Sequence, residues 1–189
     1  MTMDQTDEQL AARSQAGDHA AFGTLVERFE PKLMRYARKF LADPDDAKDI
    51  VQDVFIKTYE NLQSFDVSRR FSPWIYRIAH NEFVNALKKR ASRNTFFTID
   101  FDTIFPSLQA TDTADSSALE KDVRLALDRY LEKVDPKYRE PLILYYLEEM
   151  SYREIADIMH IPLSTVGVRI ARGRSLLQKL VPKGERIPL

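Results

Sequence analysis

Aromatic and basic side chains are interleaved in the middle of the sequence, a combination that can bind nucleic acid. Between residues 69 and 93 the chain carries seven basic residues and one acid, Glu82. Aromatic rings stack on unpaired bases while basic side chains attract phosphates, so this tract predicts a surface for single-stranded nucleic acid. The alternative is that the rings belong to a hydrophobic core. The aromatic residues concerned are Phe71, Trp74 and Tyr76.

A second basic tract, residues 161–183, contains five basic residues and no acid. It follows a segment, residues 151–159, that opens with Ser151 and Glu154 at the spacing of a capping box. A short helix, a tight turn over residues 160–163 and a basic second helix are typical of a helix-turn-helix. We therefore predict that the second helix binds duplex DNA, although similar helix pairs also occur in proteins that never touch DNA.

An acidic tract precedes both basic tracts and predicts a different kind of partner. Residues 40–66 carry seven acids against two lysines. Steps of three and four along a helix bring residues onto one face, and here that face lies opposite the apolar stripe. A surface for a basic protein is one interpretation, and an ordinary solvated helix face is the other. The residues that share this face are Asp49, Gln52, Asp53 and Ile56.

The sequence offers little for catalysis or metal binding. It has no cysteine, and its three histidines, His19, His80 and His160, are far apart, so we expect no metal site. It has no phosphate-binding glycine loop and no nucleophile motif, so we predict that the chain is not an enzyme and needs no cofactor. It has neither a run of eighteen apolar residues nor a secretory signal, so we expect the protein to stay in the cytoplasm.

Helices are expected to position these residues, because apolar residues recur at helical spacing and the chain has only five glycines. We predict an all-α fold. A first helix is expected from about Asp18, with Pro31 kinking or dividing it. A second is expected to start at Asp43 and Pro44, which suit a helix amino terminus. A third is expected over residues 73–90.

The helical pattern breaks between residues 92 and 118, where polar and acidic residues predict a flexible linker. The net charge of residues 99–122 is −5, so this stretch is expected to stay extended and to be repelled by duplex DNA. The chain is therefore expected to form two small helical domains, residues 1–91 and residues 119–189.

The second domain is expected to contain two helices ahead of the helix-turn-helix. They are predicted over residues 119–134 and residues 136–147. The last helix of the chain is expected to begin with Ser164 as its cap and to reach Leu180.

Three segments in this order resemble the extracytoplasmic-function (ECF) sigma factors, a branch of the sigma-70 family of bacterial RNA polymerase subunits. Residues 46–55 (DAKDIVQDVF) resemble the polymerase-binding helix of the family, and residues 71–81 (FSPWIYRIAHN) resemble its signature before the strand-opening helix. Residues 151–156 (SYREIA) and 164–166 (STV), with the arginines that follow, are similar to its carboxy-terminal DNA reader. The similarity spans residues 18–181, without the third domain of housekeeping members.

The resemblance implies a subunit that directs RNA polymerase to a small set of promoters. The acidic face would then dock onto the clamp helices of the polymerase large subunit, with the flap as a further contact. Promoter DNA would be bound both as duplex and as single strand. An anti-sigma factor would hold the protein inactive, and no small-molecule substrate is implied.

The resemblance also assigns residues to two promoter elements. Asn81 occupies the position implied for holding a flipped base by its amide. The minus-ten set is Arg70, Phe71, Trp74, Tyr76, Arg77, Asn81, Asn85 and Lys88. The minus-thirty-five set is Ser164, Thr165, Val166, Arg169, Arg172 and Arg174. Arginines in such a helix hold phosphates or reach guanine edges.

The sequence departs from the family at two places. Asn85 stands where many members carry aspartate. Gly167, Val168 and Ala171 stand where several relatives carry basic, serine or aromatic side chains, so the base-edge contacts there do not carry over. One expectation is that the backbone at Gly167 approaches DNA closely.

A helix-turn-helix regulator that acts without polymerase is the main alternative function. It explains the residues from Ser151 onward. It gives no role to the acidic face or to the segment between Trp74 and Asn81, which favours the sigma-factor interpretation.

Overall fold

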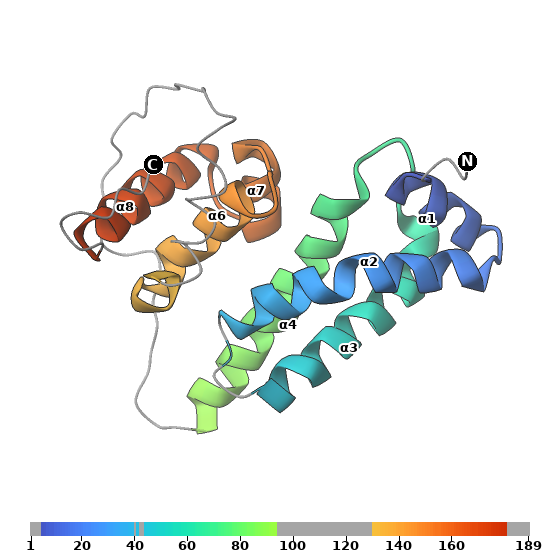
Figure 1. The fold of residues 1–189 in the computed structure, drawn as a ribbon, viewed down its shortest axis with the longest axis horizontal. Helices are drawn as coiled ribbons and strands as arrows, with labels where there is room; N and C mark the ends of the chain where they lie inside the picture. The colour runs from blue at the N-terminus through green and yellow to red at the C-terminus, as the bar shows by residue number, and fades with distance from the viewer. Residues whose placement is uncertain (1–4, 40, 42–43, 94–129, 181–189) are drawn as a thin grey trace. The chain divides into compact units, whose positions relative to one another are not determined.

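The computed structural model describes residues 5–39, 41, 44–93 and 130–180. The chain divides into two units, Met1–Ile99 and Asp100–Leu189. Every regular element among the described residues is a helix, so the prediction of an all-α fold is confirmed (Figure 1). The predicted linker beyond residue 93, and the expected helix up to residue 129, lie outside the described residues.

The amino-terminal unit contains four α-helices and a short 3₁₀ helix among its described residues (Figure 1). Helix α2 packs against α1 and α3, and α3 packs against α4. Their bounds are Asp7–Gln15 for α1, His19–Arg38 for α2, Pro44–Asn61 for α3, Leu62–Ser64 for the 3₁₀ helix and Phe71–Arg93 for α4.

Aromatic side chains of α2 and α4 form much of the core of this unit. The Tyr36 ring centroid lies 5.3 Å from that of Tyr76 and 5.0 Å from that of Phe83. Phe29 lies 5.3 Å from Phe71, nearly edge-on, a favourable geometry for aromatic pairs. These five rings are buried. The side of α4 that carries Phe71, Tyr76 and Phe83 therefore faces the core, and the opposite side of the helix faces away from it.

Helix α1 is an element that the sequence interpretation missed. Its cap is Thr6, whose hydroxyl accepts a hydrogen bond from the Gln9 backbone at 3.2 Å while the Gln9 side chain accepts one from the Thr6 backbone at 3.0 Å. This capping box is a sequence signal that could have located the helix. Its apolar stripe is short, with only Leu10 and Ala11 buried among its apolar residues.

The other helices of the unit start close to their expected positions. Asp18 caps α2 by accepting hydrogen bonds from the Ala20 and Ala21 backbones. Helix α2 continues through Pro31, so of the two outcomes expected there, a kink or a division, the division is wrong. Helix α4 begins at Phe71, two residues earlier than expected, and ends at Arg93.

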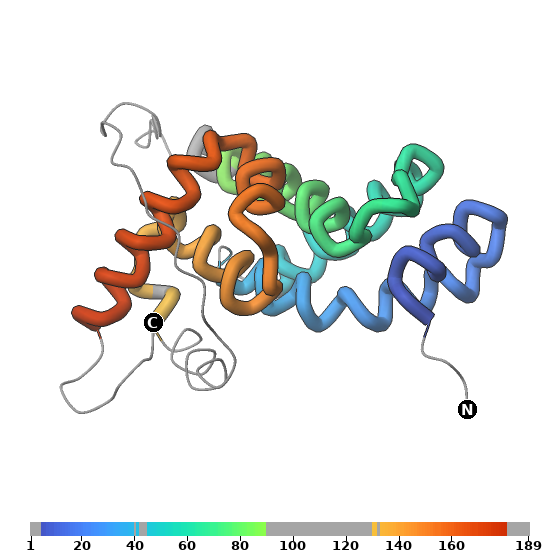
Figure 2. Tube along the Cα trace, turned by 90° about the horizontal axis from the view of Figure 1, so that it is seen from above, coloured from blue at the N-terminus to red at the C-terminus, as the bar shows by residue number. Residues whose placement is uncertain are grey.

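The carboxy-terminal unit holds a short 3₁₀ helix and three α-helices among its described residues. Figure 2 follows the chain from α7 through a tight turn into α8. Tyr130 and the 3₁₀ helix are the described end of the helix that was expected over residues 119–134. The bounds are Leu131–Lys133 for the 3₁₀ helix, Pro136–Tyr146 for α6, Tyr152–Met159 for α7 and Leu163–Leu180 for α8.

The predicted helix-turn-helix forms as α7, a turn and α8. The capping box is confirmed, because the Ser151 hydroxyl accepts from the Glu154 backbone and the Glu154 carboxylate accepts from the Ser151 backbone. His160 ends α7 in the left-handed region with φ of 54°. Helix α8 reaches Leu180 as expected, but its first turn is closed by the Pro162 carbonyl, so the prediction of Ser164 as cap is wrong.

Candidate nucleic-acid and protein interfaces

Burial separates the three aromatic residues that were expected to meet unpaired bases. Phe71 and Tyr76 are 0% exposed and belong to the core, which corrects their place in the minus-ten set. Trp74 is half-buried. Its ring centroid lies 5.0 Å from Phe65 and 5.6 Å from Phe71. Trp74 is therefore the aromatic residue of that set with surface to offer a base.

Polar and basic side chains continue outward from Trp74 along α4. From Trp74 the sequence steps by three, four, four and three residues, which keeps a helix on one face. The members of this strand-binding face are Trp74, Arg77, Asn81, Asn85 and Lys88, and all except Trp74 are exposed. Arg70, also exposed, precedes α4. The structure thus brings the remaining predicted minus-ten residues together on one side of α4.

The one acid of this tract is held by an ion pair. Glu82 Oε1 lies 2.6 Å from Lys57 Nζ on α3. The hydrogen bond to Glu82 raises the pKa of Lys57 above its ordinary value. Because Glu82 is compensated by Lys57, the adjacent strand-binding face keeps the positive charge of Arg77 and Lys88.

The predicted acidic face is present on α3. Asp49, Gln52, Asp53 and Ile56 are all exposed, with Ile56 at 48%. Tyr59 of the same helix is 45% exposed, so two large apolar side chains of α3 lie open to solvent. Gln52 and Ile56 also line a groove of about 690 Å³.

The other wall of this groove is formed by α2 residues that the sequence interpretation did not assign to any interface. Phe22, Val26, Glu30 and Met34 recur every four residues along α2 and line the groove. Phe22 and Val26 are large apolar residues, yet both are only half-buried. The sequence signal that could have identified this wall is an apolar stripe on α2 that is wider than the core requires. The groove joins apolar side chains to the acidic face of α3.

Helix α8 presents only part of the predicted minus-thirty-five set. Val166 is fully buried and packs in the core, so it is not a groove-facing residue. Gly167 is also buried, which contradicts the expectation that its backbone approaches DNA. Ser164 is exposed, and Thr165, Arg169 and Arg172 are half-buried. The last three follow at steps of four and three and share one face.

Arg174 lies on a different side of α8. Two residues along an α-helix correspond to a rotation of about 200°, so Arg172 and Arg174 leave the helix in nearly opposite directions. Burial raises the pKa of Tyr146 on α6, and the nearby charge of Arg174 opposes this rise. The charge of Arg174 therefore acts next to α6, and the predicted trio of arginines does not form a single cluster.

The described parts of the chain hold neither a metal-binding cluster nor a membrane-spanning helix. Residues 5–39, 41, 44–93 and 130–180 contain no group of three or more histidine, cysteine or acidic side chains arranged to hold a metal ion. No helix among these residues is both long and apolar enough to cross a membrane.

Comparison with protein families places both units in one class. Residues 25–93 match sigma-70 region 2, and residues 124–177 match sigma-70 region 4. The fold and these two matches define a promoter-recognition subunit of the sigma-70 class. Helix α1 precedes the matched part of region 2.

Individual relatives narrow the class further. The chain is 33% identical to the ECF RNA polymerase sigma factor SigW of Bacillus subtilis, over 86% of this chain and 90% of SigW. It is 34% identical to the ECF RNA polymerase sigma-E factor of Escherichia coli, over 96% and 97% of the two chains. The sigma factor RpoE of Bartonella quintana, solved with the anti-sigma factor NepR, is 25% identical, with a TM-score of 0.64 over 86% of this chain and 98% of that one.

The chain belongs to the ECF sigma factors of the sigma-70 family. Proteins of this family direct the initiation of transcription, and they are not enzymes. The all-helical fold, the sigma-factor identity and the DNA-binding function expected from the sequence are thereby confirmed.

Proposed function

We propose that this ECF sigma factor divides promoter recognition between the strand-binding face of α4 and the exposed face of α8. The α4 face binds the unpaired minus-ten strand, with Trp74 stacking on a base and Asn81 holding a flipped base by its amide. The α8 face, with Thr165, Arg169 and Arg172, binds the minus-thirty-five element as duplex.

One observation carries this proposal. Trp74, Arg77, Asn81, Asn85 and Lys88 lie on one side of α4, while the buried rings of the same helix point into the core. An aromatic ring, an amide and two cations on one rigid helix face supply stacking, edge recognition and phosphate attraction together. A regulator that binds only duplex DNA has no use for this combination.

We further propose that the acidic face of α3 docks onto the basic clamp helices of the polymerase large subunit. Asp49 and Asp53 supply charge complementarity, and the neighbouring groove accepts apolar side chains at Ile56. The carboxy-terminal unit makes the contact with the flap. RpoE of Bartonella quintana was solved with an anti-sigma factor, and we propose that an anti-sigma factor also binds this chain and holds it inactive.

The experiment replaces Asn81 by alanine in holoenzyme made from the full chain. Closed-complex formation is expected to stay unchanged, while strand opening loses about 2 kcal/mol because the flipped base loses its amide partner. Gel shift measures the closed complex and permanganate reactivity measures opening. A template with a pre-melted minus-ten segment is expected to rescue part of the activity.

The Arg172→Ala variant is the matched comparison and is expected to show the reverse defect. It should weaken closed complexes on duplex and respond little to pre-melting. If Asn81→Ala loses closed-complex binding, or if pre-melting restores none of its activity, Asn81 has a structural role and the assignment is wrong.

A further inference from the structure

The segment that leads into the strand-binding face, residues 62–71, is held at both ends by α1. In Figure 1 the chain passes α1 after the end of α3 and arches over to the start of α4, and α1 packs against both the 3₁₀ helix and α4. Helix α1 lies outside the part of the chain that matches sigma-70 region 2. Its contacts with the segment include specific hydrogen bonds.

Gln15, the last residue of α1, holds the start of the segment. Its side-chain Nε2 donates to the carbonyl oxygens of Leu62 and Phe65, each at 2.8 Å. In return, Gln63 Nε2 donates to the Gln15 carbonyl at 2.9 Å. Three hydrogen bonds between residues almost fifty positions apart fix where the chain leaves α3.

Glu8 holds the end of the segment. Its Oε1 accepts a hydrogen bond at 3.0 Å from the backbone N–H of Phe71, the first residue of α4. This N–H has no partner within its own helix, and a carboxylate at a helix amino terminus also interacts favourably with the helix dipole. Burial opposes ionisation of Glu8, but this bond, others nearby and the charge of Arg70 together lower its pKa.

The segment between these anchors carries side chains that reach the strand-binding face. The Phe65 ring packs 5.0 Å from Trp74 and 5.3 Å from Phe71. Asp66 accepts from the Ser68 backbone at 3.0 Å, which folds the segment into a turn. If Phe65 shifted, the Trp74 ring would therefore lose one of the side chains that pack against it.

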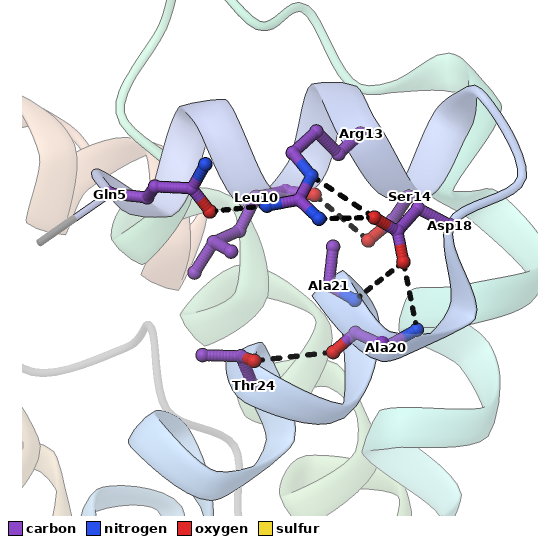
Figure 3. A network of polar contacts seen from close by, with 8 residues as sticks. All are labelled: Gln5, Leu10, Arg13, Ser14, Asp18, Ala20, Ala21 and Thr24. Carbon is purple, nitrogen blue, oxygen red and sulfur yellow. Dashed lines mark hydrogen bonds and ion pairs between the residues drawn. The ribbon is translucent and has the colours of Figure 1, made fainter. Parts of the chain in front are cut away.

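Helix α1 is itself tied to α2. Figure 3 shows Arg13 between Gln5 and Asp18, the residue that caps α2. Arg28 of α2 donates to the Gln5 carbonyl at 2.7 Å and to Asp7 at 2.8 Å. A support that is fixed on the core of the unit can hold the segment in one position.

We infer that α1 is a positioning element for the strand-binding face, in which Gln15 and Glu8 hold residues 62–71 so that the Phe65 ring orients Trp74 toward an unpaired base. This inference rests on the proposed function of the α4 face. The competing explanation is that α1 only adds buried apolar surface through Leu10 and Ala11 and so stabilises the unit.

The test uses the full chain, in which Trp74 is the sole tryptophan. Its fluorescence therefore reports on this site directly. The variant is Gln15→Leu, which keeps the side-chain size and removes both donors, and the matched control is Gln178→Leu at an exposed position of α8. The probes are single-stranded dodecamers of oligo(dA), of oligo(dT) and of random sequence, with quenching of Trp74 as the readout.

Gln15→Leu is expected to bind the dodecamers about tenfold more weakly than the parent chain. The reason is that residues 62–71 would shift, so that Trp74 would no longer be held in the geometry that contacts a base. Acrylamide quenching of Trp74 in the free protein is expected to increase. Duplex binding by the carboxy-terminal unit and the affinity for core polymerase are expected to stay unchanged. Gln178→Leu is expected to match the parent chain in all of these measurements.

Glu8 supplies a second pair of variants that does not depend on Gln15. Glu8→Gln keeps an oxygen that can accept from the Phe71 N–H, so it is expected to retain most of the affinity. Glu8→Ala removes the acceptor and is expected to resemble Gln15→Leu. Thermal melting of each variant checks folding, and the affinities are compared at a temperature where all variants are folded.

The outcomes separate this inference from the proposed function. If the parent chain binds the dodecamers and Asn81→Ala weakens that binding, but Gln15→Leu and Glu8→Ala bind like the parent, α1 only stabilises the unit and the inference is overturned. If the parent chain does not bind the dodecamers while Gln15→Leu still changes acrylamide quenching of Trp74, the proposed function of the α4 face fails and α1 remains a support for the segment.

Discussion

Arg172 and Arg174 are two positions apart in the sequence, yet they act on different neighbours. Arg172 shares a face with Thr165 and Arg169, which all retain exposed surface. Arg174 lies near Tyr146 of α6. Two arginines of one basic tract therefore differ in role, because the turn of the α-helix places their side chains in different surroundings.

This difference predicts unequal effects on duplex binding. Arg172→Ala is expected to weaken binding of the minus-thirty-five duplex by roughly 1–3 kcal/mol and to reduce its salt dependence. Arg174→Ala is expected to leave both nearly unchanged. Fluorescence anisotropy with labelled duplex over a series of salt concentrations measures both quantities. Equal losses in the two variants would show that the arginines act as one cluster after all.

The residue types of the site could be predicted from the sequence better than their exposure. Phe71, Tyr76 and Val166 were assigned to DNA contacts, but each packs in a core. Aromatic and β-branched residues serve both purposes, and sequence spacing alone does not say which rings a neighbouring helix covers. Arg77, Asn81, Asn85 and Lys88 are polar and kept their predicted exposure.

At the scale of elements, α3 has two different surfaces, one that packs in the core and one that is exposed. Its inward side packs Ala47, Val51 and Val54 in the core, and its outward side exposes Asp49 and Asp53. The outward side is bordered by the groove that α2 and α3 share. A change on the outward side should therefore affect association without affecting folding.

Reversing the charges at Asp49 and Asp53 tests this separation. The Asp49→Lys, Asp53→Lys double variant is expected to lose roughly 2–4 kcal/mol of affinity for core polymerase, because like charges would then face the basic clamp helices. The melting temperature should stay within a few degrees of the parent. Asp157→Lys, which reverses the charge of an exposed acid on α7, is the control for a charge reversal outside α3. Unchanged affinity in the double variant would remove α3 from the polymerase interface.

Close packing of α6 and α8 depends on a glycine. A Cβ placed on Gly173 would lie 2.7 Å from Leu142 Cδ1 and 3.2 Å from the Tyr138 carbonyl oxygen. Leu142 is fully buried, so its side chain has little room to move away. The two helices can approach this closely only because position 173 carries no side chain.

Gly173→Ala is accordingly expected to lower the free energy of unfolding of the carboxy-terminal unit by about 1–3 kcal/mol. Gly23→Ala is the comparison, because a Cβ at this α2 position meets nothing within 4 Å. It should stabilise the amino-terminal unit by about 0.5–1 kcal/mol through the helix propensity of alanine. Thermal or urea unfolding measures both changes. A neutral Gly173→Ala variant would mean that α6 and α8 have room to separate.

The sequence predicts a helix well where its apolar stripe is long. It predicts a helix less well where contacts with distant parts of the chain hold the helix in place. The stripes of α2, α3 and α4 located these helices from the sequence. Helix α1 has nine residues and a narrow apolar stripe. It is held in place by hydrogen bonds that Gln15 donates to, and Glu8 accepts from, distant backbone groups. Such bonds join residues that no local pattern connects.

At the scale of the whole molecule, each unit carries one proposed DNA-binding face. The amino-terminal unit presents the strand-binding face of α4, and the carboxy-terminal unit presents the α8 face. Each face rests on its own buried core, since α4 packs on α2 and α3 and α8 packs on α6 and α7. The account therefore places strand opening and duplex reading on separately folded parts of one chain.

Tethered cleavage within a holoenzyme open complex tests this central claim directly. The chain has no cysteine, so a single cysteine at Asn85 or at Ala171, both exposed, can carry an iron chelate without competing sites. The Asn85→Cys conjugate is expected to cleave within the unpaired minus-ten segment, and the Ala171→Cys conjugate is expected to cleave upstream duplex near the minus-thirty-five element. Cleavage of upstream duplex by the Asn85→Cys conjugate, or of the same segment by both conjugates, would contradict the claim.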